Sequence, residues 1–143
     1  GILYSDKGLN NILSGNFSEI LYFDDSVNWN KKVIPINKTI LNKIKDEILF
    51  LVVGNITEEK LKFIEEQLAE NIENKNIYIS NDPNKVFNYE NFVLVSYLGI
   101  TNEEEIRLIS KNLSLDNKFI LGHLIICDKI NLLNKFKLKN NFV

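Results

Sequence analysis

The fold of this chain is decided between Asn76 and Asp128, where the sequence reads NIYISNDPNKVFNYENFVLVSYLGITNEEEIRLISKNLSLDNKFILGHLIICD. Its three strand-like apolar segments are Ile77–Ser80, Phe92–Tyr97 and Phe119–Cys127. A helix is predicted over Thr101–Asn112, where Thr101 and Glu104 have the spacing of a capping box. Strands that alternate with helices in this way predict a mostly parallel, doubly wound sheet.

The first half of the chain continues the same alternation. Ile48–Val53 (ILFLVV) is a continuous apolar run, typical of a strand that is covered on both faces. Thr57 is placed to cap the next helix. The residues at helical spacing that should form its buried stripe are Leu61, Ile64, Leu68 and Ile72.

Shorter elements are predicted near both ends of the chain. Strands are expected at Glu19–Phe23 and Lys32–Ile36, and short helices at Lys7–Ser14, Thr39–Glu47 and Ile130–Phe136. Pro35 would put the second of these strands at an edge, because proline cannot donate a ladder hydrogen bond.

Together these elements predict one α/β domain spanning residues 1–143. The expected architecture is a three-layer α/β/α sandwich, P-loop-NTPase-like or Rossmann-like, with a mostly parallel sheet. The chain nevertheless contains neither GxxxxGK[ST] nor GxGxxG, so it lacks the nucleotide-binding motif of either class. We therefore expect no bound cofactor.

Composition limits the kinds of partner and the cellular compartment that are expected. The net charge is −2, with 17 basic and 19 acidic residues interspersed, which argues against nucleic acid as a partner. Cys127 is the only cysteine, so no disulfide forms within the chain and a reducing, cytoplasmic compartment is expected. No segment reaches the roughly 20 apolar residues of a membrane span, so membrane contact would come only through flanking segments of a longer protein.

The candidate site is the edge of the sheet where the parallel strands end, since ligands of this fold class bind there. The residues expected at this edge are Gly54, Asn55, Ser80, Asn81, Asp82, Gly99 and Asp128. Asp82 and Asp128 could hold Mg²⁺ through carboxylate oxygens. The alternative is that aspartates simply begin turns and cap helices at these positions.

His123 and Cys127 do not form a promising catalytic pair. They are four residues apart on one strand, so they share a face, but their Cα atoms would be about 13 Å apart. A role for His123 as a phosphorylated residue is also disfavoured, because it lies inside the apolar strand FILGHLIIC. No catalytic constellation and no histidine metal site is therefore predicted.

Four segments of the second half resemble a known family in their order along the chain. These segments are IYISNDPNKV (Ile77–Val86), NFVLVSY (Asn91–Tyr97), LGITNEEE (Leu98–Glu105) and ILGHLIICDK (Ile120–Lys129). They resemble the C-terminal half of the ParA/MinD-type P-loop domain of bacterial capsular and exopolysaccharide tyrosine kinases. KGLNNILSGNFSEI (Lys7–Ile20) is similar to a segment that lies beyond the P-loop in that family.

The chain departs from this family at the residues that perform catalysis. The family's P-loop would lie before Lys7, and Ser80 stands where the family has the aspartate of its Asp-Thr-Pro-Pro turn. The tyrosine-rich tail is also absent. The resemblance thus implies a non-catalytic, kinase-like domain of Wzz-type polysaccharide chain-length proteins, which binds a protein partner or itself.

Two other functions stay open from the sequence. One is a small α/β enzyme or phosphorelay module, receiver-like or phosphocarrier-like, that uses the carboxylates at the strand ends or His123. The other is half of a nucleotide-sugar-binding glycosyltransferase.

Overall fold

The computed structural model describes residues 1–4, 15–73 and 76–128. The helices predicted over residues 7–14 and 130–136 lie outside these ranges. The strands are β1 (Phe17–Tyr22), β2 (Ile48–Val53), β3 (Ile77–Ser80), β4 (Asn91–Tyr97) and β5 (Phe119–Cys127). The helices are α1 (Ser26–Thr39), α2 (Glu58–Asn71) and α3 (Glu103–Leu115), with short 3₁₀ helices η2 (Leu41–Lys43) and η3 (Pro83–Asn88).

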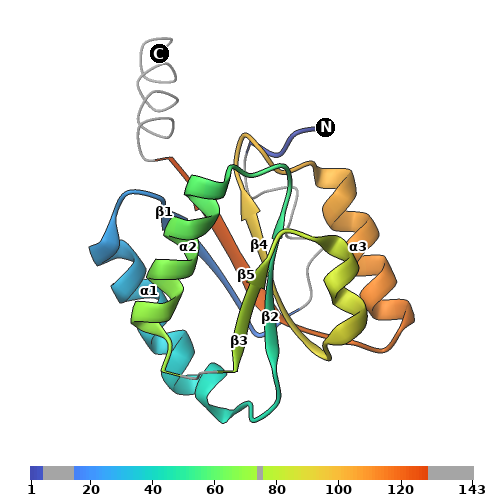
Figure 1. The fold of residues 1–143 in the computed structure, drawn as a ribbon, viewed down its shortest axis with the longest axis horizontal. Coiled ribbons are helices and arrows are strands. Elements are labelled where there is room, and N and C mark those ends of the chain that lie inside the picture. The colour runs from blue at the N-terminus through green and yellow to red at the C-terminus, as the bar shows by residue number, and fades with distance from the viewer. Residues whose placement is uncertain (5–14, 74–75, 129–143) are drawn as a thin grey trace, which may run out of the picture.

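The described strands form one parallel sheet in the order β1-β5-β4-β2-β3. Figure 1 shows α1 and α2 on one side of the sheet and α3 on the other, so the three-layer α/β/α prediction is confirmed. The order β3-β2-β4-β5 is that of the first four strands of a flavodoxin-like sheet, with β1 in the fifth place.

This strand order creates a topological switch point between β2 and β4. From β2 the chain moves through α2 to β3 at one edge of the sheet, whereas from β4 it moves through α3 to β5 in the opposite direction. The connections therefore diverge from neighbouring strands. Ligands of open α/β sheets bind beyond the carboxyl ends of the strands at such a point.

The core is divided by the sheet into two apolar clusters. All six residues of β2 are buried, as expected for a strand that is covered on both faces. On the side of α1 and α2, Trp29, Phe50 and Tyr97 are the largest fully buried side chains. On the side of α3, the residues of β2 and β4 pack against Ile106 and Leu113.

Two predictions for the segment between β1 and β2 are wrong. The strand predicted at Lys32–Ile36 lies inside α1, and the helix predicted at Thr39–Glu47 is replaced by the end of α1 and by η2. The cause is an N-cap at Asp25, whose side chain accepts a hydrogen bond from the Asn28 amide at 3.0 Å.

A buried stripe then carries α1 past its proline. Trp29, Val33 and Ile36 repeat at helical spacing and are buried against the sheet, and the Trp29 indole donates to the Tyr22 carbonyl at 2.9 Å. Pro35 is exposed on the opposite face. Burial of the stripe thus outweighs the helix-breaking effect of the proline. The five residues Lys32–Ile36 are too few for their periodicity to reveal this.

We expect Pro35→Ala to raise the free energy of unfolding by about 1 kcal/mol, because alanine restores a helical N–H at an exposed position. Urea unfolding monitored by circular dichroism measures the change. Exposed Lys38→Ala in the same helix is the control and should change stability by less than about 0.5 kcal/mol. A less stable Pro35→Ala variant would contradict this account of α1.

Candidate functional site

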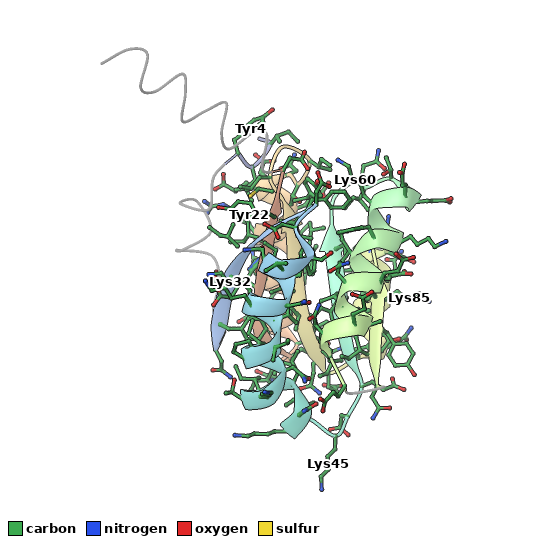
Figure 2. All side chains as sticks on the ribbon, turned by 90° about the vertical axis from the view of Figure 1, so that its left-hand side faces the viewer. Tyr4, Tyr22, Lys32, Lys45, Lys60 and Lys85 are labelled. Atoms are coloured by element: carbon green, nitrogen blue, oxygen red, sulfur yellow. The ribbon has the colours of Figure 1, made fainter. Side chains whose placement is uncertain are left out.

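The carboxyl ends of the five parallel strands meet at one end of the sheet, which we call the crest. Figure 2 shows Lys60, in the first turn of α2, at this end of the molecule, and Lys45, just before β2, at the opposite end. The candidate residues predicted from the sequence lie around the crest, but the structure divides them into separate environments.

Asp82 and Asp128 do not form a metal site. They follow β3 and β5, which are separated by β2 and β4, so about 14 Å of sheet lies between the two strands. A single Mg²⁺ ion cannot bridge that distance with direct carboxylate bonds. The hypothesis of a shared Mg²⁺ is therefore wrong. Within the described ranges, no group of three or more His, Cys, Asp or Glu side chains is arranged to hold a metal ion.

Each of these aspartates has a structural partner instead. Asp82 caps η3, because its Oδ1 accepts a hydrogen bond from the Asn84 amide at 3.0 Å. The Asp82 amide in turn donates to the Ser80 hydroxyl at 3.0 Å. Asp128 accepts a short hydrogen bond from the hydroxyl of Tyr97. Asp82 thus agrees with the alternative interpretation, in which aspartates at strand ends begin turns and caps, whereas Asp128 is instead bonded to a side chain of the neighbouring strand β4.

The switch point itself is closed by the side chain of Thr101. Its hydroxyl donates to the Val53 carbonyl at 2.6 Å and accepts from the Tyr97 amide at 2.7 Å, and so joins the ends of β2 and β4. Gly54, which follows β2, has a φ of 122°, and a Cβ on it would lie 3.2 Å from the Thr101 Cα. The backbones here are too close together to admit a ligand between them.

The capping box predicted for Thr101 and Glu104 is consequently wrong. Asn102 caps α3, and its side chain accepts from the Glu104 amide at 2.9 Å. Thr101 is fully buried and uses its hydroxyl on the sheet. Sequence reasoning missed this role because a Thr-Asn pair before a helix offers two possible caps.

The backbone amide of Gly99 is hydrogen-bonded to Leu3, near the start of the chain. The Gly99 amide donates to the Leu3 carbonyl at 2.6 Å, and the Leu3 amide donates to the Thr101 carbonyl at 2.7 Å. Gly99 has a φ of 90°, a conformation that favours glycine. Its amide thus stabilises a turn and is not directed at a phosphate.

The helices that begin at the crest carry negative charge at their N-termini. Glu58 and Glu59 lie in the first turn of α2, and α3 begins with Glu103, Glu104 and Glu105. Asp24 and Asp25 directly precede α1. Helix N-termini bind phosphate when their amides are free and no anion competes. Here carboxylates already complement the helix dipoles, so they would repel a phosphate group.

A cavity of about 450 Å³ lies at the crest on the side of α3. We call it the α3-side cavity, and it is lined by Leu51, Val52, Val53, Gly54, Asn55, Asn81, Pro83, Glu105, Leu108 and Ile109. It brings together three of the seven candidate residues, Gly54, Asn55 and Asn81. Ser80, Asp82, Gly99 and Asp128 do not line it.

A second cluster lies at the crest on the side of α1 and α2. The Tyr97 hydroxyl donates to Asp128, and the Lys60 Nζ lies 4.5 Å from the centre of the Tyr97 ring. Burial, followed by the hydrogen bond and the charge of Asp128, raises the pKa of Tyr97 far above its ordinary value. Tyr97 therefore stays protonated. Its pairing with Asp128 could not be found from sequence, because 31 residues separate them.

His123 is buried in the sheet beside Ser96. Both side chains are at most 1% exposed, and the Ser96 hydroxyl lies 3.2 Å from the His123 Nε2. The His123 Nδ1 has no hydrogen-bond partner among the described residues. Burial lowers the pKa of His123 to about 4, so the ring is neutral near pH 7. This serine-histidine pair cannot reach a substrate, since neither side chain meets solvent.

No protein-family model, no curated protein and no solved structure matches this chain. Among the described residues, no helix is long and apolar enough to cross a membrane.

We expect Thr101→Val to lower the free energy of unfolding by about 3 kcal/mol, because the Val53 carbonyl and the Tyr97 amide would be buried without a partner. Denaturant unfolding measures the loss. The matched control is Thr39→Val, whose exposed hydroxyl bonds only the Pro35 carbonyl and should matter by less than about 0.5 kcal/mol. Equal effects of the two substitutions would contradict the role of Thr101.

We expect stability to fall by about 2 kcal/mol between about pH 7 and pH 5 because of His123 alone. The folded pKa of about 4 lies below the ordinary value of 6.5, so protonation favours the unfolded chain. This contribution is complete above the unfolded pKa and is lost as the pH falls toward the folded one. Urea midpoints across this interval measure it.

The control is His123→Leu, which removes the only histidine of the chain. Its stability should be nearly constant over the same pH interval, whatever its absolute value. A pH dependence that persists unchanged in this variant would show that another group is responsible.

Proposed function

We propose that this chain is a non-catalytic, kinase-like domain that binds a protein partner or a second copy of itself in bacterial polysaccharide assembly or export. The proposal includes a cytoplasmic location. It rests on the ordered resemblance of segments such as Asn91–Tyr97 to the polysaccharide tyrosine kinases, together with Ser80 at the position where that family has an aspartate. Cys127 is the single cysteine of the chain and so forms no disulfide within it, which is consistent with a reducing compartment.

The charge of the crest supports the non-catalytic part of the proposal. A nucleoside triphosphate is bound through free backbone amides and cations at the points where strands lead into helices. At these positions α2 has Glu58 and Glu59, followed by Lys60 with its ammonium over the Tyr97 ring, and α3 has three glutamates. The switch point between β2 and β4 is bonded shut by Thr101.

An apolar patch at the opposite end of the sheet supports the binding part. Phe87, Leu115 and Phe119 are 75%, 73% and 71% exposed, unusually open for such large side chains. Their segments lie together, because the Lys118 ammonium donates to the Val86 carbonyl at 2.6 Å. Exposed apolar side chains on adjoining segments support an interaction surface here.

A phosphorelay function has less support. Asp82 and Asp128 lie on strands that are not neighbours, and each is engaged in a hydrogen bond. The buried His123 cannot accept a phosphoryl group from a donor in solution. Asp82 and Asp128 therefore do not belong to one acidic pocket of the receiver type.

Calorimetric titration with ATP and Mg²⁺ tests the non-catalytic part. We expect no measurable heat of binding up to about millimolar nucleotide, because the crest carboxylates oppose the phosphates. A shift of amide NMR signals at Gly54 and Asn55 on nucleotide addition is a second readout. Micromolar affinity by either method would contradict this part of the proposal.

Sedimentation equilibrium with surface variants tests self-association through the apolar patch. We expect wild-type protein to associate at about 100 µM, and Phe119→Asp to weaken association by about tenfold or more. Val27→Asp is the control, since Val27 is equally exposed but lies on α1. A monomeric wild type, or equal effects of both substitutions, would contradict self-association through this patch.

A further inference from the structure

The α3-side cavity has an apolar floor that the core holds in place. Leu51 and Val53 of β2 belong to the buried cluster on the side of α3, and Ile109 packs against that cluster. Leu108 also lines the cavity but is 60% exposed, so it lies where the cavity opens to solvent. The volume of about 450 Å³ is in the range of small-molecule sites.

Three polar side chains, Asn55, Asn81 and Glu105, line the same cavity. Within the part of the chain that the structure describes, none of the three makes a side-chain hydrogen bond or ion pair. Their carbonyl and carboxylate oxygens are therefore available to accept hydrogen bonds from a ligand.

The charge at the cavity determines whether it favours a cationic or an anionic ligand. Among the described residues that line the cavity, only Glu105 is charged. The nearest basic residue of α3, Arg107, is paired with Glu103 at 2.8 Å and so does not neutralise Glu105. Glu104, also in the first turn of α3, adds to the negative potential. Phosphates and carboxylates are thus disfavoured, whereas a cation is attracted.

We infer that the α3-side cavity binds a small organic cation. Its apolar body would lie on Leu51, Val53 and Ile109, and its ammonium group would pair with Glu105. Asn55 and Asn81 would accept or donate the remaining hydrogen bonds. The site lies beside the switch point, where ligands of open α/β sheets bind, but on the side of α3 because Thr101 closes the point itself.

This inference does not rest on the proposed function. The cavity is at the crest, whereas the apolar patch of Phe87, Leu115 and Phe119 is at the end of the sheet where β4 and β5 begin. Either site can fail its test without affecting the other.

A pair of probes with the same apolar body and opposite charge tests the inference. Naphthylmethylammonium and naphthoate are titrated separately into the full chain, and amide NMR shifts report the affinity and the site. We expect the cation to bind with shifts centred on Gly54, Asn55 and Asn81, and the anion to bind at least about tenfold more weakly. Equal affinities, a tighter anion, or no binding of the cation at millimolar concentration would overturn the inference.

Matched variants establish where the cation binds. Leu108→Lys places a positive charge at the opening and should abolish binding, whereas Asn112→Lys places the same charge at an exposed position of α3 outside the lining and should not. Both positions are exposed, so both variants are expected to fold. Binding that survives Leu108→Lys, or that is lost equally in both variants, would place the cation elsewhere.

A second pair of variants tests the role of charge. Glu105→Gln keeps the size of the side chain and should reduce the preference for the cation over the anion by several-fold, about the contribution of one partly exposed ion pair. Glu104→Gln is in the same helical turn but outside the lining, and should leave most of the preference. An unchanged preference in Glu105→Gln would overturn the assignment of the ammonium to Glu105.

Discussion

The hydroxyl of Thr101 is the contact on which the geometry of the crest depends. It bonds the end of β2 and the end of β4 at the point where their helices leave in opposite directions. In most doubly wound sheets this divergence leaves a crevice for the ligand. Here the crevice is filled by the protein itself, with Gly54 allowing the close approach and Leu3 bonded to the backbone on either side of the loop.

Negative charge at the crest opposes a phosphate ligand in addition to the closure by Thr101. Every helix that starts at the crest has acidic residues in or just before its first turn, which stabilises the helix and opposes phosphate. The same residues therefore strengthen the fold and exclude the ligand most common for this architecture. The α3-side cavity lies beside the closed switch point, and Glu105, the charged residue among its described lining residues, has the opposite preference.

The sequence predicted the sheet well because each central strand is a continuous apolar run. The central strands Ile48–Val53 and Phe119–Cys127 match the observed ones, as does the edge strand Ile77–Ser80, and Thr57 caps α2 as expected. Prediction failed where one short segment fits two structures: KVIPI resembles a strand, but Trp29 and the Asp25 cap make it part of α1. The candidate site was predicted only as a set of strand ends.

Strand order, which no single segment encodes, then separated Asp82 from Asp128 and brought Asn55 near Asn81. The pairing of Tyr97 with Asp128 depends on the same order. The place of β1 beside β5 has a further consequence, for the time course of folding. Phe17 pairs with Gly122, residues more than a hundred positions apart, whereas each of the other pairings joins strands closer in sequence. Closing so long a loop is costly and slow, so β1 should dock last, and a chain emerging from the ribosome must keep its first strand unpaired until its fifth has been made.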